Sequence, residues 1–192
     1  MGLDAPQVEE TTVKIFNIPN LLTLSRILAV PIFVLLMLEP DPLRALIAGL
    51  VFALASATDW LDGYLARRWG QVTKFGKLLD PVADKILIMS ALVILVEIDI
   101  IRAWIAIVLI GREFAITGLR SIAASEGMII PAETLGKYKL VTQTIAIIAL
   151  LLNYYLDMAW LKNIGWCALW IAMVLSIYSG GLYFRKYGKQ LN

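Results

Sequence analysis

Four aspartates stand close together in the sequence, in two pairs. Asp59 and Asp62 are three residues apart, and Asp80 and Asp84 are four apart. On a helix, either spacing places both carboxylates of a pair on one face. If two such faces oppose each other, the four carboxylates repel strongly and need cations between them. Oxygen ligands suit Mg²⁺ or Mn²⁺, and paired ions of this kind serve phosphoryl chemistry by stabilising the attacking and leaving oxygens.

Each aspartate also has a structural alternative. Asp80 precedes Pro81, a pair that is typical of a helix N-terminus. Arg67, Arg68 and Lys85 could instead pair with the carboxylates in an interfacial ion cluster. For the set as a whole we favour the metal site, because the helical spacings and the intervening glycines would otherwise be coincidental.

The composition excludes several other kinds of chemistry. The chain contains no histidine and one cysteine, Cys167, which lies in an apolar stretch. This excludes phosphohistidine, histidine general bases, Cys/His metal clusters and a disulfide framework. Acid–base chemistry must therefore use Asp, Glu, Lys or Tyr.

The aspartates lie in a chain that is too apolar for a soluble domain of 192 residues, with 60% hydrophobic residues and a mean hydropathy of +0.78. Its continuous apolar runs favour membrane helices over barrel strands, which alternate. The sequence predicts an all-α integral membrane protein, one domain over residues 1–192 with a polar segment at 1–16. Six transmembrane helices are expected at 20–38, 43–69, 78–98, 103–124, 139–156 and 163–184.

The basic residues are distributed unevenly between the two ends of these segments. Fourteen fall on one side, and only Arg44, Arg102 and Lys162 fall on the other. Because positive residues concentrate in cytoplasmic loops, both termini are predicted to be cytoplasmic. We therefore expect a protein of the cytoplasmic (inner) membrane whose aspartates, and active site, face the cytoplasm.

A second group of charges could bind an anion. Arg112 and Arg120 are eight residues apart, about two helical turns, and Lys137 and Lys139 begin the fifth segment. Arginine suits phosphate through bidentate hydrogen bonds, and lysine adds a point charge. The alternative is ordinary anchoring at lipid headgroups. We favour phosphate binding for Arg112 and Arg120, and both alternatives stay open for the two lysines. Arg112 in particular adjoins Glu113 within an apolar run, where charged residues are usually functional.

Polar residues also recur at helical spacing at the start of the first segment, at Asn20, Thr23 and Arg26. Asn20 could cap the helix, or it could contact a nucleotide or lipid phosphate. The sequence leaves both alternatives open.

The aspartates belong to a longer pattern, D-x2-D-G-x2-A-R-x8-G-x3-D-x3-D. All eight of its specified positions are present between residues 59 and 84 with the correct gaps. In this the chain resembles the CDP-alcohol phosphotransferases. The stretches NIPNLLTLSRI (17–27), GREFAITGLR (111–120) and GKYKLVTQ (136–143) are similar to the phosphatidylglycerophosphate synthase branch of that family.

The resemblance implies a role for each matching residue. Asp59, Asp62 and Asp80 would bind two divalent cations, Mg²⁺ or Mn²⁺, and Asp84 would bind a metal and act as the general base. The CDP moiety would be bound by a further set of residues, namely Gly63, Ala66, Arg67 and Gly76, with Asn20 and Thr23 as additional candidates.

The reaction implied is transfer of a phosphatidyl group from CDP-diacylglycerol to glycerol 3-phosphate, which yields phosphatidylglycerophosphate and CMP. Separately from the resemblance, the charge of Arg112, Arg120, Lys137 and Lys139 makes them the candidates to bind the acceptor phosphate. A homodimer surrounded by membrane lipid is also implied, and no nucleic-acid partner is expected. Inositol phosphate, serine or phosphatidylglycerol stays open as the acceptor. An ion or proton transporter is the alternative from another class, although its ionisable groups would lie nearer the bilayer midplane.

Overall fold

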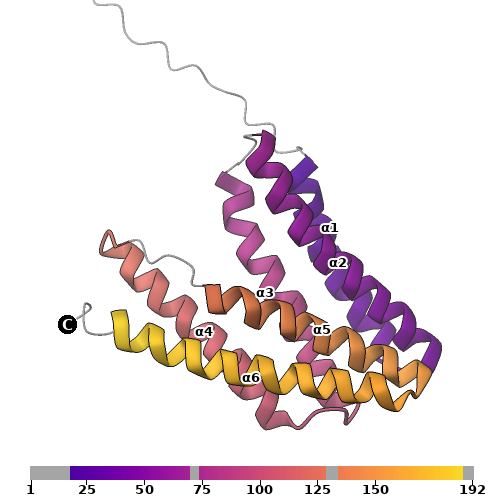
Figure 1. Ribbon diagram of the computed structural model, residues 1–192. Coiled ribbons are helices and arrows are strands. Elements are labelled where there is room, and N and C mark those ends of the chain that lie inside the picture. Colours follow the sequence, from indigo (N-terminus) through magenta and orange to yellow (C-terminus); the bar gives the residue numbers. More distant parts are fainter. Residues whose placement is uncertain (1–17, 70–73, 129–133, 188–192) are drawn as a thin grey trace, which may run out of the picture.

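The computed structural model describes the backbone of residues 18–69, 74–128 and 134–187. Side chains are described for residues 21–58, 82–128 and 134–187. Within these ranges the structure is entirely helical, which confirms the predicted all-α class. The helices are α1 (Ile18–Met37), α2 (Pro42–Trp69), α3 (Lys74–Glu97), α4 (Ala103–Ser125), α5 (Thr134–Leu156) and α6 (Ala159–Tyr187) (Figure 1).

The turns at one end of the molecule are short and built by aspartates. Asp41 caps α2, because its carboxylate accepts a hydrogen bond from the backbone N–H of Arg44 at 2.9 Å, and Pro42 occupies the first helical position. Asp99 and Asp157 follow α3 and α5 with φ of 57° and 47°. Aspartate is one of the few non-glycine residues that adopts this left-handed conformation readily. These turns fold each helix back on its predecessor.

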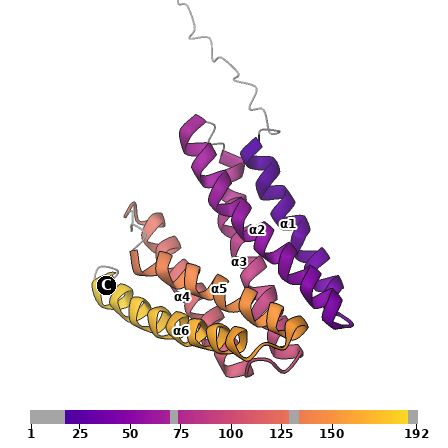
Figure 2. The ribbon, with the colours of Figure 1, turned by 45° about the vertical axis from the view of Figure 1, so that its right-hand side comes forward.

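The helices form two groups that cross at a steep angle. Helices α1, α2 and α3 lie side by side in one group, while α5 and α6 run together across it, with α4 beside them (Figures 1 and 2). Buried apolar side chains from all six helices make one continuous core, among them Phe33, Phe52, Leu95, Leu109 and Leu169. Helices α5 and α6 approach closely at Gly165, where an added Cβ would lie 2.7 Å from Cγ of Leu150.

The outer surface is apolar along much of its length. Large hydrophobic side chains are exposed on every helix, for example Leu28, Leu54, Val93, Ile107, Ile145 and Val174. Such a surface is unsuited to water and suited to lipid. Two described helices, α5 and α6, are long and apolar enough to cross a membrane, and Leu21–Met37 and Pro42–Thr58 form shorter apolar helical stretches. The apolar exterior and these two helices favour a helical membrane protein, and the six-span count stays a prediction.

Candidate active site

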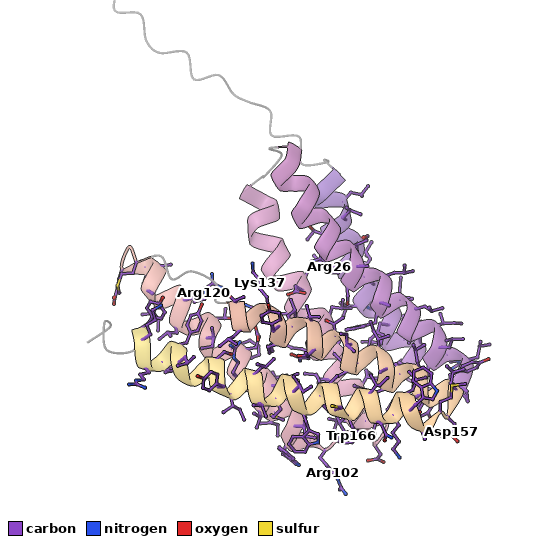
Figure 3. All side chains as sticks on the ribbon, viewed as in Figure 1. Arg26, Arg102, Arg120, Lys137, Asp157 and Trp166 are labelled. Carbon is purple, nitrogen blue, oxygen red and sulfur yellow. The ribbon has the colours of Figure 1, made fainter. Side chains whose placement is uncertain are left out.

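A cavity of about 330 Å³ lies where α3, α4 and α5 meet, and a residue of α6 also reaches it. Asp84 of α3 lines this cavity. So do all four basic residues for which the sequence suggested phosphate binding, namely Arg112, Arg120, Lys137 and Lys139. Figure 3 shows Arg120 on α4 and Lys137 at the start of α5. The fold thus gathers Asp84 and these four basic residues, which span 55 positions of the sequence, from Asp84 to Lys139.

Glu113 joins two of these basic residues. Its Oε2 accepts a hydrogen bond from Nζ of Lys139 at 2.5 Å and one from Nη1 of Arg112 at 3.3 Å. The Lys139 side chain is only 5% exposed. A buried ammonium group is costly unless an anion offsets its charge, and Glu113 is that anion. The pair therefore links α4 to α5 inside the cavity wall.

Arg112 also reaches across to α6. Its Nε donates a hydrogen bond to the carbonyl oxygen of Ser176 at 3.1 Å, and its Nη2 donates to Oγ of Ser179 at 2.7 Å. Gly180 leaves room for the arginine stem, because a Cβ there would lie 3.4 Å from Cγ of Arg112. Much of the hydrogen-bonding capacity of Arg112 is thus used within the protein.

The other two basic residues differ in this respect. Arg120 and Lys137 are exposed, and their side chains make no hydrogen bond or ion pair within the part of the chain that the structure describes. Their donors are therefore available to an anion that enters the cavity.

Lys85, next to Asp84, ties α3 to α4. Its Nζ donates to Oγ1 of Thr117 at 2.6 Å, and that hydroxyl donates to the carbonyl oxygen of Glu113 at 2.8 Å. Lys85 also lines the cavity. The sequence had suggested that Lys85 could pair with the aspartates in an ion cluster, and its contact with Thr117 was not foreseen.

The other three aspartates of the predicted metal site lie in α2 and α3. Asp59 and Asp62 belong to the last turns of α2, and Asp80 lies one turn before Asp84 in α3. Figure 1 shows these ends of α2 and α3 next to each other. Because α3 begins at Lys74, Asp80 is inside the helix and the capping alternative for it is wrong. The side chains of Asp59, Asp62 and Asp80 lie outside the described residues, so a four-carboxylate cluster stays a prediction.

The predicted nucleotide contacts are described only in part. Asn20 is inside α1, which begins at Ile18, so it does not cap that helix. Thr23 and Arg26 are buried in α1, with 1% and 0% of their surface exposed. The side chains of the other predicted contacts lie outside the described residues, namely Asn20, Gly63, Ala66, Arg67 and Gly76.

Sequence reasoning missed several polar residues of this region. Ser176, Ser179 and Tyr183 lie at helical spacing on α6 and are buried, with Tyr183 lining the cavity. Gln143 follows Lys139 by one turn on α5 and is also buried. The available signal was the recurrence of polar residues every three or four positions within apolar helices, which places them on one inward face.

Comparison with known proteins identifies the family to which the chain belongs. A family model described as CDP-alcohol phosphatidyltransferase matches residues 16–178. The chain therefore belongs to this family, as its aspartate pattern predicted.

Individual proteins are also similar to the chain over most of its length. Three relatives bear the name CDP-diacylglycerol–glycerol-3-phosphate 3-phosphatidyltransferase. That of Bacillus subtilis is 44% identical over 183 residues, which cover 89% of this chain and 95% of the relative. That of Pseudomonas fluorescens is 43% identical over 175 residues, covering 88% and 89%. That of Haemophilus influenzae is 42% identical over 171 residues, covering 85% and 89%.

Proposed function

We propose that this protein transfers a phosphatidyl group from CDP-diacylglycerol to the 1-hydroxyl of glycerol 3-phosphate and releases CMP. The observation that carries the proposal is the cavity of about 330 Å³, in which the carboxylate of Asp84 stands among basic side chains from three helices. The names of the relatives support this donor and this acceptor.

The basic residues are proposed to bind the acceptor phosphate. Glycerol 3-phosphate carries a dianionic phosphate, which needs fixed positive charge. Arg120 and Lys137 are exposed at the cavity, and neither pairs with another described side chain. Arg112 and Lys139 are less exposed, and both donate hydrogen bonds to Glu113. They therefore add positive potential to the cavity but have fewer N–H donors left for the phosphate.

Asp84 is proposed to be the general base. It is half-buried and lines the cavity, where the acceptor hydroxyl would lie. Its carboxylate would take the proton of the 1-hydroxyl while the oxygen attacks the phosphorus of the phosphatidyl group. A bond forms between that oxygen and phosphorus, and the bond from phosphorus to the CMP oxygen breaks. CMP leaves with the electron pair of that bond.

Two divalent cations, Mg²⁺ or Mn²⁺, are proposed to be held by Asp59, Asp62, Asp80 and Asp84. The donor set fits hard cations, because it consists of carboxylates on the adjoining ends of α2 and α3. When bound, the ions would supply positive charge for the pyrophosphate of the donor.

The nucleotide itself is proposed to be bound by residues of α1, α2 and α3, near the same helix ends. Thr23 is buried on α1, which packs against α2 and α3. The other members of the proposed set are Asn20, Gly63, Ala66, Arg67 and Gly76.

The protein is further proposed to be a single domain that crosses the cytoplasmic membrane six times. Both termini and the active site would face the cytoplasm. The alternation of helix ends supports this, because the ends rich in lysine and arginine all fall on the side of the cavity. Homodimerisation stays a prediction from the family resemblance.

The test of this function is CMP release by the purified protein in detergent micelles. CDP-diacylglycerol and Mg²⁺ would be supplied with glycerol 3-phosphate, inositol 1-phosphate, serine or phosphatidylglycerol in turn. We expect release of CMP with glycerol 3-phosphate and with none of the other three acceptors. Chelation of divalent cations should abolish release, and Mg²⁺ or Mn²⁺ should restore it. Release of CMP with another acceptor would reassign the substrate, and none with any acceptor would contradict the enzyme function.

A further inference from the structure

Gln143 is buried without a structural reason for its polarity. It lies in the middle of the apolar part of α5 and is 1% exposed, and its Oε1 has no hydrogen-bond partner among the described residues. An unsatisfied buried amide destabilises a protein, and an apolar side chain of similar size would pack there without that cost. Such a residue therefore suggests a ligand that completes its hydrogen bonds.

Gln143 also lines a small cavity that continues the larger one. This inner cavity has a volume of about 20 Å³ and is lined by Asp84 of α3, Glu113 of α4 and Gln143 of α5. The two cavities share five residues, namely Asp84, Lys85, Glu113, Lys139 and Leu140. A volume above roughly 10–15 Å³ accepts one group the size of a water molecule. The inner cavity therefore has room for a single hydroxyl group.

Other polar groups of the inner cavity already have partners within the protein. Lys139 donates to Glu113, and Lys85 donates to Thr117. Gln143 is the residue there whose side-chain oxygen is buried and unpartnered within the described part of the chain. From Lys137 to Gln143 the α5 helix rises about 9 Å, so the inner cavity lies below the proposed phosphate position at the mouth.

We infer that Gln143 is a specificity-determining residue that hydrogen-bonds the hydroxyl of the acceptor that does not attack. An amide both donates and accepts hydrogen bonds, as does a hydroxyl, so the two groups are complementary. The contact selects a phosphorylated polyol over an acceptor with only one hydroxyl. This inference rests on the proposed function, because it concerns the acceptor of that reaction.

The experiment compares two acceptors that differ by this one hydroxyl, glycerol 3-phosphate and 3-hydroxypropyl phosphate. The wild-type protein should use glycerol 3-phosphate with a kcat/KM about 10- to 100-fold higher than that for 3-hydroxypropyl phosphate, because the acceptor without the second hydroxyl leaves the amide unpaired. Gln143→Leu should lower kcat/KM for glycerol 3-phosphate about 10-fold or more and change that for 3-hydroxypropyl phosphate less than about 2-fold. The preference for the second hydroxyl is thereby lost.

A matched control is available on the same helix. Asn153 of α5 also has a buried side-chain oxygen without a partner in the described chain, and it lines neither of the two cavities. Asn153→Leu should leave the ratio of the two kcat/KM values unchanged. Gln143→Asn, which keeps the amide but shortens its reach, should give an intermediate ratio and serves if Gln143→Leu fails to fold.

The outcomes separate this inference from the proposed function. If a folded Gln143 variant lowers kcat/KM equally for both acceptors, or keeps the wild-type ratio of the two kcat/KM values, Gln143 does not determine the preference for the second hydroxyl. Release of CMP by the wild-type protein with glycerol 3-phosphate would still uphold the proposed function in that case. If the wild-type protein releases no CMP with either acceptor, both proposals are wrong.

Discussion

At the scale of single residues, the four basic side chains around the cavity divide into two kinds. Arg112 and Lys139 are bonded to Glu113, and Arg112 is also bonded to α6. Arg120 and Lys137 are exposed and make no such bonds within the described part of the chain. Loss of the first kind should disturb the fold and the acceptor together, whereas loss of the second kind should affect the acceptor alone.

Arg120→Ala is predicted to weaken acceptor binding selectively. We expect KM for glycerol 3-phosphate to rise about 10-fold or more, because a charge-assisted hydrogen bond to the phosphate is lost. KM for CDP-diacylglycerol and the melting temperature should hardly change. Arg102→Ala, at an exposed arginine just before α4, is the control and should behave like the wild type. An equal rise in both KM values would contradict the assignment of Arg120.

Glu113 and Lys139 are predicted to be energetically coupled. Glu113→Gln should lower the free energy of unfolding, because it leaves the buried ammonium of Lys139 without its anion. Lys139→Met in the same chain should recover part of the loss. A double-mutant cycle on detergent-solubilised protein should give a coupling free energy of about 1–3 kcal/mol. Additive effects of the two substitutions would show that the pair contributes nothing to stability.

Sequence reasoning identified the basic residues of the cavity and not their contacts. Arg112, Arg120, Lys137 and Lys139 were found because charges within apolar runs are costly and seldom incidental. The bond from Lys139 to Glu113, and that from Arg112 to Ser179, join helices whose residues are 26 and 67 positions apart. Such contacts depend on how the helices cross, which the apolar pattern of each helix alone does not determine.

At the scale of elements, apolar runs located every helix but placed some ends wrongly. The third and fifth helices were expected from residues 78 and 139, whereas α3 begins at Lys74 and α5 at Thr134. The first turns of both carry lysines, so a criterion based on hydropathy leaves them out. The first turn of α5 contributes Lys137 to the cavity.

Close packing of α5 on α6 gives a prediction at this scale. Gly165→Ala should lower the free energy of unfolding by about 1–3 kcal/mol, because the added Cβ would lie 2.7 Å from Cγ of Leu150 and 3.3 Å from its backbone nitrogen. Gly181→Ala on the same helix meets nothing within 4 Å and should be neutral or slightly stabilising. Thermal unfolding in detergent would measure both. Equal stability of the two variants would mean that α5 and α6 do not approach closely at Gly165.

At the scale of the whole molecule, the apolar exterior and the distribution of charge predict one orientation in the membrane. In a Cys167→Ser background, a cysteine at Asp157 should react with a membrane-impermeant maleimide on intact cells. A cysteine at Arg185, near the end of α6, should react only after the membrane is opened. Labelling of the Arg185 position in intact cells would contradict a cytoplasmic C-terminus.

The central claim is that the protein transfers a phosphatidyl group to glycerol 3-phosphate in the cavity between α3, α4 and α5, with Asp84 as the general base. It is tested most directly by CMP release from CDP-diacylglycerol, with Mg²⁺ and glycerol 3-phosphate, by the wild-type protein and by Asp84→Asn. We predict that the wild-type protein releases CMP. The variant should be slower by about 10²- to 10⁴-fold or more, with an unchanged melting temperature. Near-normal turnover by a folded Asp84→Asn protein would contradict the claim.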